Sequence, residues 1–388
     1  MDTILSTPIT WSMIEADLKK ALSTSAIFGS AKKAEAFGKG CSFLSKTVLL
    51  TFDWQGCGSQ ELPETALLKV CQRQPQEERG TDIFDSSLLN DNELLLYTET
   101  VKALPPNFPI PRYYCGRLYS KELEAGYVLI EFVANASLCH LVHNVQFDGV
   151  LEVVGWLAEM AVYSIKNPEK LALAKTVDAN DECLKDFTRL EISLARYDKM
   201  EAHFPDLKED IDYFRVKTRE VLKDFDTLQT LRDKISNVKL ICHGDPWPPN
   251  LLWKRGANGN FHVFKFVDWQ LFHIGTPCWD LTLFLFGCMA PEDYDRIPDA
   301  IRHYYDLITA RVGYKNPWDN VEQLLTEFEK IFAWLILMLL PMNVGMLGSC
   351  MEALNEVDEG RIAEYGRLLD AKMRRLSEET KKYLLKWY

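Results

Sequence analysis

The chain lacks the features that mark a secreted or disulfide-bonded protein. Its first residues do not form a basic segment followed by an apolar one, since Asp2 stands where a signal peptide would carry a positive charge. Its 10 cysteines are scattered, and no two of them form a Cys-x-x-Cys pair. Reduced, unpaired cysteines are the rule in the cytoplasm. These absences predict a cytoplasmic protein.

The chain also lacks an excess of positive charge and a long apolar segment. It has 44 Lys and Arg against 56 Asp and Glu, and the formal net charge of −12 argues against a nucleic acid partner or a general affinity for anionic membranes. Its most conspicuous apolar run, Ile331–Met342, has 12 residues and contains Pro341. Because about 20 apolar residues are needed to cross a bilayer, this run predicts a buried helix and no membrane span.

The most informative segment runs from Val238 to Asp280. An apolar strand leads to His243, and three prolines between residues 246 and 249 disfavour helix and predict an ordered loop. Two β-prone stretches then flank an Asn-Gly turn, which is typical of a β-hairpin. The segment therefore predicts a strand, a loop and a hairpin in succession.

Three polar side chains converge in this predicted arrangement. Folding the hairpin about its turn places Asp268 about two residues, roughly 7 Å of strand, beyond Asn250. Asp245 lies five residues before Asn250, the same Asp-to-Asn spacing as in the catalytic loop of kinases. Oxygen ligands such as those of Asn250 and Asp268 are the kind that Mg²⁺ prefers. The pattern favours phosphoryl transfer, in which an acid accepts a hydroxyl proton while Mg²⁺ neutralises phosphate charge.

These residues belong to three spaced motifs. They are His-Gly-Asp-x-Trp-x-x-Asn at residues 243–250, Asp-Trp-Gln at 268–270 and Pro-Cys-Trp-Asp-Leu at 277–281. In their order and spacing the chain resembles the CHK kinase-like or ecdysteroid-kinase-like family, which is part of the superfamily of aminoglycoside phosphotransferases and choline kinases. The resemblance covers about residues 36–345.

The resemblance implies an α+β, protein-kinase-like fold with two lobes. We expect a small, β-rich nucleotide-binding lobe over residues 1–133 and a larger helical lobe with the catalytic loop and substrate pocket over 134–388. The implied roles are catalysis for Asp245, Asn250 and Asp268, Mg²⁺ binding for Asn250 and Asp268, and structural support for His243 and Asp280.

The N-terminal part contains a candidate loop and strand for binding ATP. The segment 38–45 has the pattern Gly-x-Gly-x-x-Phe-x-Ser, which is similar to the nucleotide-covering loop of the CHK-like group and includes Gly38, Gly40 and Ser42. Lys69 lies in an alternating strand over 65–70, where kinases place the lysine that contacts ATP phosphates.

Further nucleotide contacts follow from the resemblance. Glu93, in a predicted helix over 87–104, would pair with Lys69, and Glu99 is a competing candidate. Main-chain groups of Glu131 and Val133 would bind adenine at the connector between the lobes.

We therefore expect an ATP- and Mg²⁺-dependent phosphotransferase that acts on a hydroxyl of a small organic molecule. Protein substrates are disfavoured because Asp-Trp-Gln replaces Asp-Phe-Gly and the Ala-Pro-Glu segment of protein kinases is missing. The acceptor stays open: aromatic and acidic residues of the helical part suit a choline- or ethanolamine-like amine, and the apolar run suits a steroid-like or xenobiotic alcohol.

Two other interpretations stay open. The chain is alternatively a nucleotide-binding pseudokinase or scaffold that keeps the fold without turnover. Cys139, His140 and His143 suggest a metal site, although no second ligand cluster has zinc-like spacing.

Overall fold

The computed structural model describes residues 2–38, 45–72, 87–174, 176–177, 179–187, 189–221 and 225–388. The N-terminal part holds helices α1 (Trp11–Leu22) and α2 (Ser87–Thr98) and strands β1 (Ile27–Phe28), β2 (Lys33–Ala36), β3 (Lys46–Thr51), β4 (Trp54–Gln55), β5 (Thr65–Gln72), β6 (Tyr113–Ser120) and β7 (Ala125–Glu131). Five of these strands form an antiparallel sheet in the order β2-β3-β5-β7-β6, and β1 pairs with β4.

The two helices cover opposite faces of this sheet. Alternate residues of β7 belong to different cores: Tyr127 and Leu129 pack in the cluster that contains Ile14 of α1, whereas Val128 and Ile130 pack in the cluster that contains Leu94 of α2. This alternation follows from the two-residue period of a strand. The spacing of Ile14, Leu18 and Leu22 predicts a helix over Trp11–Leu22. It is confirmed as α1, with Ile14 and Leu18 buried and the Thr10 side chain capping its start.

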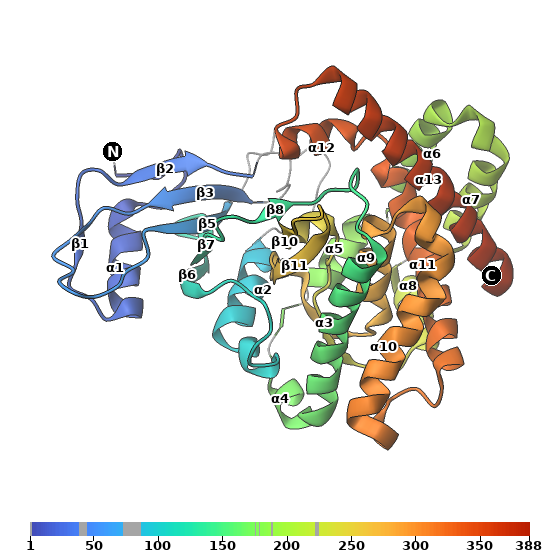
Figure 1. Cartoon of the computed structure of the whole chain (residues 1–388), viewed down its shortest axis with the longest axis horizontal. Helices are drawn as coiled ribbons and strands as arrows, with labels where there is room; N and C mark the ends of the chain where they lie inside the picture. Colours follow the sequence, from blue (N-terminus) through green and yellow to red (C-terminus); the bar gives the residue numbers. More distant parts are fainter. Residues whose placement is uncertain are drawn as a thin grey trace.

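The remainder of the chain is mostly helical. Its helices are α3 (Phe147–Lys166), α4 (Pro168–Leu173), α5 (Ala179–Phe187), α6 (Leu190–His203), α7 (Lys208–Val221), α8 (Phe225–Ile235), α9 (Cys278–Cys288), α10 (Ile297–Val312), α11 (Val321–Asn343), α12 (Leu347–Leu354) and α13 (Glu359–Trp387). Its strands are β8 (Ser137–Leu138), β9 (Leu240–Cys242), β10 (Leu251–Arg255), β11 (Phe261–Phe266) and β12 (His273–Gly275). Figure 1 shows the β-rich part at one end and the helices gathered at the other, which confirms the predicted α+β, protein-kinase-like class.

The predicted hairpin is confirmed, but its register differs from the prediction. With a β-bulge between Leu252 and Trp253, Asn250 lies opposite Val267, so Asp268 is one residue and not two beyond it. β10 and β11 are antiparallel, with Leu251 opposite Phe266 and Leu252 opposite Lys265. β8 adds a third strand at the other edge of β10, and β9 pairs with β12 beside the hairpin. The strand before the loop and the chain after the hairpin are thereby fixed to one another.

The apolar run Ile331–Met342 lies in α11, whose residues from Ile331 to Met338 are all buried. Within the described ranges, no single helix is long and apolar enough to span a membrane; α11 and α12 together pass that test by length and composition, but they are bent by 75°. The sequence also predicts long charged helices over 181–200 and 207–231. The first is divided into α5 and α6 by the non-helical residue Arg189, and the second contains α7 and α8.

Candidate active site

The candidate site lies where the β-rich part meets the hairpin. Lys69 comes from β5, Glu93 from α2 and Asp268 from the turn after β11, and these residues are brought together from positions up to 199 apart in the sequence. Lys69 Nζ lies 2.7 Å from Glu93 Oε2 and also bonds a carboxylate oxygen of Asp268. Of the two candidate partners for Lys69, the structure places Glu93 beside it, whereas Glu99 is exposed just beyond α2.

Burial and the close pairing of opposite charges shift the pKa values of Lys69 and Glu93. Burial lowers the pKa of Lys69, but the neighbouring charges of Asp268 and Glu93 outweigh this effect and hold the pKa above its ordinary value. Burial raises the pKa of Glu93, and the Lys69 ammonium opposes that rise. We therefore describe Lys69 as a permanent cation held between two acids.

The predicted loop begins immediately after β9 and is held by Asp280. Its carboxylate accepts from the backbone N–H groups of His243 at 2.6 Å and Gly244 at 2.9 Å. Burial raises the pKa of Asp280 to about 7, while the same two N–H donors act to lower it. The indole N–H of Trp279 donates to the Gly244 carbonyl at 2.9 Å, so the first turn of α9 secures both sides of this glycine.

His243 ties the loop to the hairpin. Burial lowers its pKa to about 4, so the imidazole is neutral near pH 7. Its Nε2 lies 3.0 Å from the Val267 carbonyl, an acceptor, which requires the proton on Nε2. Its Nδ1 is then free of a proton and accepts from the Asp245 N–H at 3.3 Å. The histidine thus links the backbone of Asp245 to that of Val267, the residue before Asp268.

Asp245 and Asn250 face each other across the loop. Asn250 Nδ2 donates to the Asp245 carbonyl oxygen at 2.9 Å and to its carboxylate at 2.8 Å. Burial, reinforced by the charge of Asp268, raises the pKa of Asp245 to about 8. The Val267 N–H donates to the Asn250 carbonyl at 3.0 Å, which brings Asn250 to within one residue of Asp268 along the hairpin. We call Lys69, Glu93, Asp245, Asn250 and Asp268 the polar cluster.

Asp268 has an unusual backbone. Its φ of 63° and ψ of 63° lie in the left-handed region, which costs a non-glycine residue about 1 kcal/mol or more. The conformation ends the strand and starts a single 3₁₀ turn, Trp269–Leu271, so the carboxylate leaves the hairpin toward Lys69. Such strained residues persist where the surrounding structure fixes them, as the bond to Lys69 does here.

The remaining predicted nucleotide-binding residues are only partly described. Gly38 has a φ of +71° and lies directly before the undescribed segment, and Gly40 and Ser42 lie outside the described residues. The ring of Phe37 contacts Phe132 edge-on at 5.4 Å, so the start of the loop lies beside the connector between Glu131 and Val133. The Glu131 N–H donates to the Arg112 carbonyl at 2.8 Å, and its carboxylate accepts from the Arg112 N–H at 3.0 Å.

Sequence reasoning did not foresee the role of Asn92, which directly precedes Glu93. Its Nδ2 donates to the carbonyl oxygens of Gln270 and Phe272, both at 2.9 Å, and its Oδ1 accepts from Thr176 Oγ1 at 2.7 Å and Val177 N at 3.0 Å. One fully buried amide therefore joins α2 to the segment after Asp268. The sequence contains no specific signal for this role, because Asn92 lies within a run of four polar residues, 90–93.

The oxygen groups of the cluster are suited to Mg²⁺. The two bonds of Asn250 use its amide nitrogen, so its side-chain oxygen is not needed for them, and the carboxylate of Asp268 has a second oxygen besides the one bonded to Lys69. Across the described residues, no group of three or more His, Cys, Asp or Glu is placed to hold a metal ion. Mg²⁺ does not require one, because it keeps several waters and binds one or two carboxylates together with substrate phosphates.

The metal site suggested by Cys139, His140 and His143 is not formed among the described residues. His143 Nδ1 accepts from the backbone N–H of His140 at 3.0 Å, and His140 Nδ1 lies 2.9 Å from Cys350 Sγ, a residue far along the chain. His140 thus contacts Cys350 of α12, and the Nδ1 atom of His143 already accepts a hydrogen bond from the backbone.

The fold is of the kinase-like class. The model of the family DUF1679, described as "Uncharacterized oxidoreductase dhs-27", matches residues 1–78 and 72–386. The chain therefore belongs to this family, which is ecdysteroid-kinase-like or CHK-kinase-like, as the three motifs predict.

Two kinds of relatives resemble the chain. The protein "Uncharacterized oxidoreductase dhs-27" of Caenorhabditis elegans is 30% identical over 91 residues, which cover 21% of this chain and 11% of that protein. The match spans only about a tenth of that relative. Choline kinase from Cryptosporidium parvum Iowa II is 11% identical, with 97% of this chain and 96% of that chain covered and a TM-score of 0.54. Plasmodium vivax ethanolamine kinase is 11% identical, with 88% and 82% covered and a TM-score of 0.42.

Proposed function

We propose that the protein is an ATP- and Mg²⁺-dependent phosphotransferase whose acceptor is a hydroxyl group of a small organic molecule. The observation that carries the proposal is the convergence of Lys69 and Glu93 from one part of the chain with Asp245, Asn250 and Asp268 from the other. Phosphoryl transfer needs a fixed cation for phosphate oxygens, oxygen ligands for a metal and an acid near the acceptor. The polar cluster contains each of these groups.

In this proposal the residues divide the work of positioning and charge neutralisation. Lys69, held by Glu93, binds phosphate oxygens of the nucleotide, and the segment around Gly38, Gly40 and Ser42 covers them. Asn250 and Asp268 hold Mg²⁺, which supplies positive charge against the phosphates when bound. Asp245 accepts or orients the proton of the acceptor hydroxyl.

The rest of the chain supports this division. We assign residues 1–133 to nucleotide binding and 134–388 to the loop and the acceptor, with main-chain groups of Glu131 and Val133 at the connector. His243 and Asp280 act as positioning residues, because their hydrogen bonds hold the backbone of His243, Gly244 and Asp245 and join it to Val267.

The fold supports the same function by analogy. The structure that it resembles with a TM-score of 0.54 is a choline kinase, which is a small-molecule kinase by name. The word "oxidoreductase" in the name of the nematode relative describes a protein of which the match covers 11%, so it is a weak guide to the activity of this chain. The amine and steroid-like acceptor classes both remain candidates within the proposal.

The alternative is a nucleotide-binding scaffold without turnover. Both functions predict that Mg²⁺ and ATP raise the thermal midpoint of the protein. Only the phosphotransferase predicts ADP release that depends on an acceptor, measured with choline, ethanolamine, steroid alcohols and glycosides in separate reactions. If no acceptor of any class raises ADP release above the rate in its absence, the scaffold is the better account.

A matched pair of variants makes this test specific. Asp245→Asn keeps the size of the side chain but removes the proton acceptor, and we expect ADP release to fall by about 10²-fold or more. Asp306→Asn, on the exposed surface of α10, makes the same chemical change away from the site and should leave the rate unchanged. Equal rates in both variants would remove Asp245 from the mechanism.

A further inference from the structure

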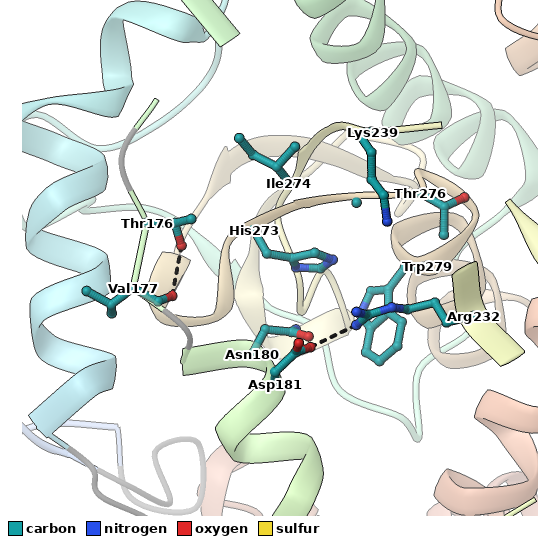
Figure 2. Close-up of a pocket in the computed structure, with 11 residues that line it drawn as sticks. Thr176, Val177, Asn180, Asp181, Arg232, Lys239, His273, Ile274, Thr276 and Trp279 are labelled. Atoms are coloured by element: carbon teal, nitrogen blue, oxygen red, sulfur yellow. Dashed lines mark hydrogen bonds and ion pairs between the residues drawn. The ribbon is translucent and has the colours of Figure 1, made fainter. Parts of the chain in front are cut away.

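A cavity outside the polar cluster lies against β12, the strand that pairs with β9. Its volume is about 250 Å³. Strand β12, Trp279 of α9 and Lys239, which directly precedes β9, form one side, and residues of α5 and α8 form the other. Figure 2 shows the polar and aromatic side chains that surround it: Asn180, Asp181, Arg232, Lys239, His273 and Trp279. Among the described residues that line it, none belongs to the polar cluster.

Two side chains that line this cavity carry a hydrogen-bond acceptor. Asn180 is 5% exposed, and within the described part of the chain its Oδ1 has no hydrogen-bond partner. His273 Nδ1 lies 3.1 Å from the Leu271 carbonyl, and burial lowers the pKa of this histidine to about 4. A neutral ring that donates from Nδ1 has its lone pair on Nε2. A ligand O–H or N–H group can donate to His273 Nε2. The Asn180 oxygen is shielded from solvent, so a ligand reaches it only when this side chain turns toward the cavity; that turn would pair an acceptor whose unpaired burial is costly.

Two cations present donors to the same cavity. Arg232 Nη1 lies 2.8 Å from Asp181 Oδ1, and the other oxygen of that carboxylate accepts from Gln229 at 2.7 Å. Asp181 is thus already paired, while the guanidinium has further N–H groups. Lys239 Nζ lies 3.0 Å from Asp233, which also approaches Arg232 at 4.0 Å. Since Lys239 and Asp233 are about half exposed, their ion pair is weak, and Lys239 is able to turn to a bound anion.

We propose that this cavity binds a small organic anion, a carboxylate or a phosphate monoester, that also carries hydroxyl or amino groups. The anionic group binds Lys239 and Arg232, and the hydroxyl or amino groups donate to Asn180 and His273. The volume lies below the roughly 300–1,000 Å³ that is typical for drug-sized ligands, so the ligand is a small metabolite.

The cavity is connected to the polar cluster by hydrogen bonds. Thr176 and Val177, which line it, both donate to the Asn92 side chain, and Asn92 directly precedes Glu93 in α2. On the other side, Trp279 lines the cavity and donates to the carbonyl of Gly244, next to Asp245. A ligand that orders these contacts should therefore alter the affinity for ATP. This second step rests on the proposed function, whereas binding itself does not.

Calorimetric titration of the full chain without nucleotide tests the binding step. The probes are glycerate and glycerol 3-phosphate, which have an anion and hydroxyls, with glycerol and inorganic phosphate as probes that have only one of the two. We expect glycerate or glycerol 3-phosphate to bind and both partial probes to bind at least tenfold more weakly. Comparing glycerate with glycerol 3-phosphate shows whether the cavity prefers a carboxylate or a phosphate monoester. Failure of both full probes to bind would overturn the proposal.

Two variants locate the site. Lys239→Gln removes a half-exposed cation, and Asn180→Asp keeps the side-chain shape while adding a charge that repels an anion; each should weaken binding about tenfold or more. Lys208→Gln, an exposed lysine on α7, is the matched control and should bind as the wild type does. Circular dichroism checks that all three variants are folded. Wild-type affinity in both cavity variants would overturn the assignment.

Calorimetric titration also measures the coupling between binding of the anion and binding of ATP. The affinity for Mg²⁺ATP should change by about 5- to 150-fold when the anion is saturating, and Lys239→Gln should abolish the change. ATP binding with an unchanged affinity would refute the coupling. If ATP does not bind at all, the proposed function is refuted, while the anion titration still shows whether the cavity binds an anion.

Discussion

The replacement Gly244→Ala tests the frame of the candidate site independently of any activity. Gly244 has a φ of +91°, and a Cβ there would lie 2.5 Å from the carbonyl carbon of Leu271. The left-handed backbone costs an alanine about 1 kcal/mol. The overlap is with backbone that cannot rotate away, so the loop must shift and weaken its bonds to Asp280 and Trp279, for about 1–3 kcal/mol more. We expect a total loss of about 2–4 kcal/mol.

The matched control is Gly259→Ala in the hairpin turn. Its φ is +83°, but no atom of the described structure lies within 4 Å of an added Cβ, so it should cost only the backbone term of about 1 kcal/mol. Urea denaturation measures the free energy of unfolding of the wild type and both variants. If the two alanines destabilise the protein equally, the close approach of Gly244 to Leu271 is not a feature of the folded protein, and the account of the loop is refuted.

Three further predictions concern the polar cluster and its neighbour. Glu93→Gln should lower ADP release by about 10²-fold because Lys69 loses the acid that orients it; a rate as high as that of the control Glu99→Gln would contradict this role. Because the pKa of Asp245 is raised to about 8 and a base acts only when ionised, ADP release should rise with pH up to that value and then level off; a rate that falls over this range would contradict it. Asn92→Leu should cost about 2–4 kcal/mol in urea denaturation, since four hydrogen bonds are lost and two buried carbonyls lose a donor; a loss under about 1 kcal/mol would show that the linkage is not formed.

The features that the sequence predicts well are local. The proline-rich loop, the Asn-Gly turn and the two β-prone stretches predict the hairpin, but its register also depends on the bulge between Leu252 and Trp253, which was not predicted from the sequence. The proximity of Asn250 to Asp268 follows from the hairpin itself, because a shift of one residue leaves both near the same end. The strand over 65–70 was predictable from its two-residue period. The helix predicted over 87–104 is present as α2, but it ends at Thr98 and is followed by a separate 3₁₀ turn over Thr100–Ala103.

The features that the sequence does not predict depend on contacts between distant segments. The helical region after α3 divides into shorter helices than expected, because its ends are set by packing and not by strong local signals. The choice of Glu93 over Glu99 is likewise decided by the packing of α2 on β6 and β7, which turns one face of the helix toward Lys69. Periodicity identifies a buried face but does not identify what lies opposite to it.

Asn92 shows why such contacts matter for function. Four carbonyl, amide and hydroxyl groups from two separate loops meet one side chain, and a residue with both a donor and an acceptor is needed to satisfy them. Because Asn92 and Glu93 are consecutive in α2, any movement of this helix that separates Glu93 from Lys69 must also strain the bonds to the segment after Asp268. We therefore expect the Lys69–Glu93 ion pair and the hydrogen bonds of Asn92 to be coupled. The position of α2 then depends both on the segment after Asp268 and on Thr176 and Val177. Through these hydrogen bonds, the proposed anion-binding cavity is linked to the polar cluster without a direct contact between them.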